Sequence, residues 1–184
     1  MDPTRIIAIR HGETPWNADA RIQGQRDVDL NDTGRWQAQR VVRALAEEPI
    51  TAVYSSDLSR AQSTAKPLAQ TKGIPVIPHE GLRERSFGKF EGMTFDQIHQ
   101  EWPDLAQRWR SRVPDWQPPE GGESLFELRQ RCARSGHSWW ISSKVMPSNL
   151  PKLRSRRPSC GMTGMPLVSA SGLAVDCARD RSLE

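Results

Sequence analysis

The chain has 184 residues, 36% of them hydrophobic and 26% charged, a balance typical of one soluble globular domain with its own core. It has no apolar run of the roughly 20 residues that cross a membrane, and its N-terminus lacks the apolar stretch of a secretory signal. Three widely spaced cysteines fit neither a disulfide framework nor a zinc site, so we expect a cytoplasmic location, no metal and no other cofactor. The net charge of +4 lies wholly in residues 135–184, which argues against nucleic acid as a partner.

Up to residue 134, short apolar runs alternate with helical patterns. The β-branched run at 5–9 is typical of a buried parallel strand. Apolar residues then recur at helical spacing after the N-cap residues 31–33. In chain order, the predicted elements are a strand at 5–9, a helix at 31–45, a strand at 51–54, a helix at 58–72 capped by 55–57 and stopped by Gly73, a strand at 74–77, helices at 94–99 and 104–112, and a helix that opens at 123–124.

This alternation predicts an α/β fold, a three-layer α/β/α sandwich with a mostly parallel sheet. Pro75 places the third strand at an edge of that sheet, because proline cannot donate a ladder hydrogen bond.

Residues 135–184 have a different character. They contain ten serines, four prolines and scattered basic residues, with no sustained period of 2 or 3.6. We therefore divide the chain into a core at 1–134 and an aberrant segment at 135–184 that replaces the end of the same domain. We expect this segment to be loosely docked, because it has little apolar surface to bury.

The segment Arg10-His11-Gly12-Glu13-Thr14 directly follows the first predicted strand. Ligands of open α/β sheets bind beyond the carboxyl ends of the strands, so this segment lies where chemistry is expected. Arg10 can bind phosphate oxygens with two hydrogen bonds, and Gly12 allows a close backbone approach. A neutral His11 imidazole can attack phosphorus and form a covalent intermediate.

Two further segments follow the second and third predicted strands. Arg60 falls in the first turn of a helix, where backbone N–H groups and the helix dipole favour an anion. Glu84 lies between Arg83 and Arg85, and a carboxyl group beside an anion site is suited to general acid catalysis.

Together these segments resemble the histidine phosphatase superfamily, which includes cofactor-dependent phosphoglycerate mutases and many small phosphatases. The resemblance covers about residues 4–134 and implies a phosphoglycerate mutase-like fold. It also implies that His11 is phosphorylated, that Glu84 is the acid and base, and that Arg10 and Arg60 contribute to catalysis. The residues that it implies for substrate binding are Arg10, Asn17, Gln23, Gly24 and Arg60.

A second histidine of this family lies on a late apolar strand, in Val-Val-Ser-His-Gly or a similar segment, and the chain has no such segment. His137 lies too early and in a different context to replace it. A change of reading frame explains the loss, since suitable codons for residues 157–164 read in a shifted frame as Val-Val-Trp-His-Asp-Gly. A natural variant with a replaced C-terminus is the alternative. Both predict a gap in the sheet and reduced activity.

The function expected from the resemblance is hydrolysis of a small phosphorylated metabolite through a phosphohistidine. The short stretch between Glu84 and the Gly-Gly-Glu-Ser segment at 121–124 favours a phosphatase. Two alternatives stay open: a cofactor-dependent phosphoglycerate mutase, and a non-catalytic phosphate-binding protein. The expected partner is the small substrate, with a homodimer left open and no membrane or nucleic acid.

Overall fold

The computed structural model describes the backbone of residues 5–142 and 172–177, and the surroundings of the side chains at 5–135. The described residues form one four-stranded sheet in the order β1-β4-β2-β3. Its strands are β1 (Arg5–Arg10), β2 (Ile50–Ser55), β3 (Val76–Pro78) and β4 (Gly172–Cys177). β1, β2 and β3 run in one direction, and β4 runs against both of its neighbours. Three of the four strands run in the same direction, which confirms the prediction of a mostly parallel sheet, and β4 is the antiparallel exception. β3 lies at an edge, as predicted.

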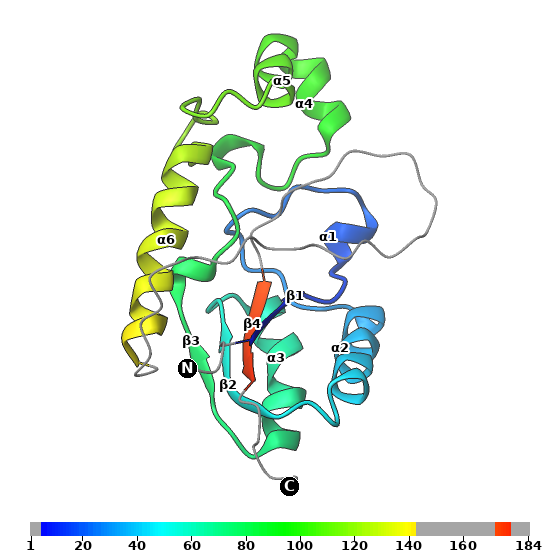
Figure 1. Ribbon diagram of the computed structural model, residues 1–184. Coiled ribbons are helices and arrows are strands. Elements are labelled where there is room, and N and C mark those ends of the chain that lie inside the picture. The colour runs from blue at the N-terminus through cyan, green and yellow to red at the C-terminus, as the bar shows by residue number, and fades with distance from the viewer. Residues whose placement is uncertain (1–4, 143–171, 178–184) are drawn as a thin grey trace, which may run out of the picture.

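Helices lie on both sides of this sheet (Figure 1). α2 and α3 pack together on one side, while α6 lies on the other side. α4 and α5 pack against each other away from the sheet, at the top of the figure. The helices are α1 (Pro15–Ala18), α2 (Asp32–Ala44), α3 (Ser59–Lys72), α4 (Phe95–Glu101), α5 (Pro103–Arg110) and α6 (Leu125–Ser142), with short 3-10 turns at Glu80–Leu82 and Gly88–Phe90. The predicted α/β/α arrangement is confirmed.

Two apolar clusters hold the described residues together. The first joins β2 to α3 through Ile50, Val53, Ala65, Leu68 and Ala69. The second joins α4 and α5 to the turn at 87–90 through the buried side chains of Phe87, Phe90, Ile98 and Ala106, with several aromatic residues packed around them. The second cluster forms one wall of the cavity described below.

Helix ends follow local chemistry in most places. The Asn31 side chain accepts a hydrogen bond from the Gly34 N–H at the start of α2, and Gly73 ends α3 in the left-handed conformation with φ 68°. The predicted cap of α3 is wrong. Its N-cap is Leu58, and the Asp27 carboxylate, 32 residues earlier in the chain, accepts from the Ser59 N–H at 2.7 Å. This long-range contact replaces the local cap.

Regular structure continues past residue 134, contrary to expectation. α6 runs to Ser142, and β4 fills the position between β1 and β2, with Arg10 opposite Gly172 and Arg5 opposite Cys177. The expected gap is thus closed by an antiparallel strand, because β1 and β2 each offer an unpaired row of backbone groups on that side. The segment at 157–164 lies outside the described residues, and the division of the chain at residue 134 stays a prediction.

Candidate active site

The loop after β1 is fixed to both helices on its side of the sheet. The Gly12 N–H donates to Thr64 Oγ1 on α3 at 2.9 Å, and the Glu13 N–H donates to Gln37 Oε1 on α2 at 2.8 Å. A Cβ on Gly12 would lie 2.5 Å from the Gly34 carbonyl oxygen, so only glycine permits this close approach. The fixed loop gives His11 a defined position at the carboxyl end of β1.

His11 is neutral and presents a free ring nitrogen. Its side chain is buried, and Nδ1 lies 2.7 Å from the Gly12 carbonyl oxygen. Because a carbonyl oxygen can only accept, Nδ1 carries the hydrogen and Nε2 carries the lone pair. Nε2 is buried and has no hydrogen-bond partner among the residues that the structure describes. Burial, followed by the positive charges of Arg60 and Arg10, lowers the pKa of His11 to about 4, although the Gly12 hydrogen bond opposes this.

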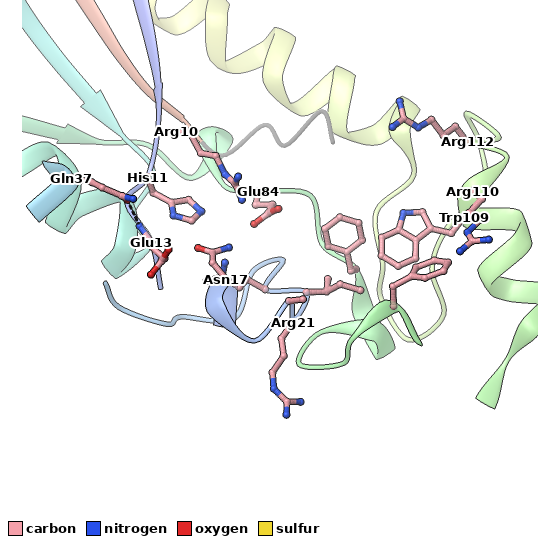
Figure 2. Close-up of a pocket in the computed structure, with 15 residues that line it drawn as sticks. Arg10, His11, Glu13, Asn17, Arg21, Gln37, Glu84, Trp109, Arg110 and Arg112 are labelled. Atoms are coloured by element: carbon pink, nitrogen blue, oxygen red, sulfur yellow. Dashed lines mark hydrogen bonds between the residues drawn. The ribbon is translucent and has the colours of Figure 1, made fainter. Parts of the chain in front are cut away.

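His11 lines a cavity of about 800 Å³, which is shown in Figure 2. One end is polar, and there His11, Asn17 and Glu84 lie around a common space. The other end is aromatic and contains Trp109, with Arg110 beyond it. The lining residues are Arg10, His11, Glu13, Asn17, Ala20, Arg21, Ile22, Gln23, Gln37, Glu84, Phe87, Phe95, Trp109, Arg110 and Arg112.

Five of the seven predicted site residues line this cavity, namely Arg10, His11, Asn17, Gln23 and Glu84. Asn17 has a structural task as well, because its Oδ1 accepts from the Thr14 N–H at 3.1 Å and completes the cap of α1. Gln23 is buried, and its Oε1 accepts from the Thr14 hydroxyl at 2.8 Å.

Arg60 and Gly24 lie behind the wall of the cavity. The Arg60 side chain has no exposed surface, and its guanidinium donates to the carbonyl oxygens of Gly24 at 2.7 Å and Arg26 at 2.8 Å. It also donates to Glu84 Oε2 at 3.1 Å. Burial lowers the pKa of this guanidinium, and the nearby Glu84 carboxylate raises it. In this structure, Arg60 fixes a loop and orients a carboxylate of the cavity.

A second arginine holds the backbone around Glu84. Arg131, on α6, donates to the carbonyl oxygens of Gly81 and Arg83, both at 3.0 Å, and of Glu84 at 3.3 Å. Its guanidinium also binds both carboxylate oxygens of Glu123, at 2.7 and 2.8 Å, and these contacts raise its pKa. Helix α6 thereby sets the position of a segment that is about 50 residues away in sequence.

Several residues that shape the cavity were not predicted. Gln37 anchors the loop after β1, and Trp109 supplies much of the far wall; both lay in helices whose residues were assigned only to packing. Glu91 was missed too. Its Oε1 accepts from the N–H groups of Gln25 and Phe87, both at 3.0 Å, and so ties two loops together. No local pattern marks such contacts, because their partners are distant in sequence.

His79 and His99 are not among the described residues that line the cavity. His79 is half-buried, and its Nδ1 accepts from the Gly81 N–H at 3.0 Å. His99 is exposed. His137 lies on α6, and its side chain is outside the described part of the chain.

Sequence comparison gives the class of protein to which this site belongs. Residues 6–138 match the profile of the histidine phosphatase superfamily (branch 1). The chain belongs to this superfamily, as the motifs around His11, Arg60 and Glu84 predicted. Among the residues that the structure describes, no helix is both long enough and apolar enough to cross a membrane.

Similar proteins include phosphatases and a mutase-like protein. Phosphoglycerate mutase-like protein 4 of Arabidopsis thaliana is 44% identical, over 72% of this chain and 58% of that protein. The metal-independent phosphoserine phosphatase of Arabidopsis thaliana is 42% identical, over 70% of this chain and 55% of that protein. The chain thus spans less than two thirds of these relatives. A mycobacterial glucosyl-3-phosphoglycerate phosphatase, solved with inorganic phosphate, superposes with a TM-score of 0.66 at 33% identity, covering 76% of this chain and 64% of the other.

Proposed function

We propose that this site hydrolyses phosphomonoesters through a phosphohistidine at His11. The observation that carries the proposal is the free Nε2 of a neutral, buried imidazole at the end of β1, facing a cavity that Arg10 also lines. A lone pair held at a fixed position needs no deprotonation before attack. The phosphatases among the relatives support the same reaction class.

The reaction takes two displacements at phosphorus. In the first, His11 Nε2 forms a bond to phosphorus while the bond to the ester oxygen breaks. Glu84, once it has taken a proton from the entering substrate monoanion, gives that proton to the departing alkoxide. In the second, water attacks the phosphohistidine, Glu84 takes a proton from it, and His11 is released. Arg10 neutralises charge on the phosphoryl oxygens, which is the main contribution that a protein makes to phosphoryl transfer.

Trapping the intermediate tests this proposal. The chain is mixed with ³²P-labelled phosphomonoester, quenched in base and assayed for a label that is stable to alkali and lost in acid. We expect label in the unchanged chain and none in His11→Ala. His99→Ala, which changes an exposed histidine, is the matched control and should keep the label. Label that persists in His11→Ala would remove this residue from the role.

Specific observations favour two alternative functions, a phosphoglycerate mutase and a phosphate-binding site without turnover. The mutase-like relative favours return of the phosphoryl group to a second hydroxyl, so product analysis with 3-phosphoglycerate would give an isomer instead of inorganic phosphate. The residues of β4 include no histidine, which favours a site that binds phosphate without turnover. In that case phosphate would bind, and no labelled histidine would form.

A further inference from the structure

The far end of the cavity, away from His11, is lined by aromatic and basic side chains that phosphoryl transfer does not require. A phosphoryl group fills the volume of a few water molecules, each about 30 Å³. The cavity of about 800 Å³ leaves most of its space for the leaving group. Side chains at that end therefore determine which phosphomonoester fits.

An ordered aromatic wall faces this space. The Trp109 ring packs against Phe87, Phe90 and Phe95, with centroids 5.4, 5.8 and 5.6 Å apart. Three ring contacts fix Trp109 before any ligand binds, so stacking on it costs little side-chain entropy. Such a surface favours a flat apolar group.

The charge beyond this wall is positive. Four arginines and two glutamates line the cavity. Both glutamate carboxylates already interact with other residues of the chain. Glu13 accepts a hydrogen bond from Asn31 Nδ2 at 2.8 Å, and Glu84 forms an ion pair with Arg60. The Arg110 guanidinium lies 4.2 Å from the centroid of the Phe95 ring, which lines the same end of the cavity. A second anionic group on the ligand would meet this cation.

We propose that the substrate is a phosphomonoester whose leaving group has a flat apolar body that stacks on Trp109 and ends in a second anion that binds Arg110. This inference rests on the proposed function, because it places the phosphoryl group at His11. It differs from phosphoglycerate and phosphoserine, which are printed in the names of two relatives and have no flat apolar body.

Binding of non-hydrolysable phosphonates to the full chain tests the inference without relying on turnover. Calorimetry would compare methylphosphonate, benzylphosphonate and 4-carboxybenzylphosphonate. We expect benzylphosphonate to bind about tenfold more tightly than methylphosphonate. The added carboxylate should improve binding by roughly three- to fivefold more.

Two variants assign these gains to residues. Trp109→Leu should remove the benzyl gain, and Arg110→Gln should remove only the carboxylate gain. Trp36→Leu is the matched control, because Trp36 is 60% exposed on α2 and lies outside the cavity. It should leave all three affinities unchanged. Arg110 is exposed, so its variant tests the second half of the inference even if Trp109→Leu folds poorly.

The outcomes separate this inference from the proposed function. Equal binding of methyl- and benzylphosphonate, together with labelled His11, would overturn the substrate class and leave the phosphohistidine reaction standing. A benzyl gain that survives in Trp109→Leu would overturn the stacking site. Absence of binding by every phosphonate, with no labelled histidine, would overturn both.

Discussion

His11 links the chemistry of the site to the stability of the chain. Its pKa falls from 6.5 to about 4 on folding, mainly through burial. Between these values the unfolded chain binds one more proton than the folded chain, so the free energy of unfolding should decrease as the pH falls from about 6.5 towards 4. The loss is roughly 3 kcal/mol when complete. Urea unfolding of the ligand-free chain at pH 7, 5.5 and 4.5 measures it.

His11→Asn is the control for this pH dependence, because it removes the titrating group. The loss of stability over this pH range should be smaller in the variant by the contribution of His11. If both chains lose stability equally, the imidazole is not protected from protons in the folded state.

Arg60 should matter for folding as well as for phosphate binding. Arg60→Ala leaves the Gly24 and Arg26 carbonyl oxygens and the Glu84 carboxylate without their donor. We expect a loss of roughly 3–5 kcal/mol in the free energy of unfolding, because one member of a buried ion pair is removed. Phosphate affinity should fall with it. If Arg60→Ala weakens phosphate binding but leaves the free energy of unfolding unchanged, the Arg60 guanidinium lies in the cavity and not behind its wall.

At the scale of elements, α6 controls the position of Glu84 through Arg131. Arg131→Lys cannot reproduce five hydrogen bonds to four residues. If Glu84 protonates the leaving group, its displacement should slow alkyl phosphates, which need a proton, more than p-nitrophenyl phosphate, which does not. We expect about a tenfold larger loss of kcat for the alkyl ester. The measurement is the ratio of the two kcat values.

Arg129→Lys is the control on the same helix, because Arg129 is exposed. It should leave the ratio unchanged. Equal losses for both esters in Arg131→Lys would show that Arg131 stabilises the fold and does not position the acid.

The central position of β4 predicts that a proline in this strand destabilises the sheet. It pairs with β1 on one side and β2 on the other, so its backbone groups face partners in both directions. A proline at position 174 (Ala174→Pro) removes a donor from this central strand and should cost about 3 kcal/mol or more. Val76→Pro on the edge strand β3 should cost less. Melting temperatures and amide exchange in β1 would report both, and equal losses would place β4 outside the sheet.

In the whole molecule, β4 lies between β1 and β2, and its residues include no histidine. Installing Val-Val-Ser-His-Gly in place of β4 should raise the melting temperature, because β-branched residues favour strands more than the glycine and alanine of β4 do. A second histidine at its end should also raise turnover by roughly 10²–10³-fold, the effect of one preorganised donor. The matched control carries Val-Val-Ser-Gln-Gly, which should restore stability without that gain in rate. Rapid turnover by the unmodified chain would show that the present segment is a functional replacement.

The sequence by itself determined the features that depend on neighbours in the chain. The strand at 5–9, the Asn31 cap, the Gly73 stop and the edge position of the third strand follow from local preferences, and the structure has each of them. The expectation that the strand at 5–9 is a buried parallel strand is wrong, because its residues are exposed or half-buried and it pairs with β4 in the antiparallel direction. His11 and Glu84 were assigned to segments that follow predicted strands, where ligands of open α/β sheets bind.

Tertiary structure alone decided which groups are available for chemistry. It placed the Arg60 guanidinium behind the cavity, brought Arg131 to the backbone of Glu84 and assembled the aromatic wall around Trp109. It also closed the sheet with β4 in the antiparallel direction. These features join residues that are far apart in sequence. Their energies depend on burial and on which backbone groups remain unpaired, so they exist only once the chain has folded.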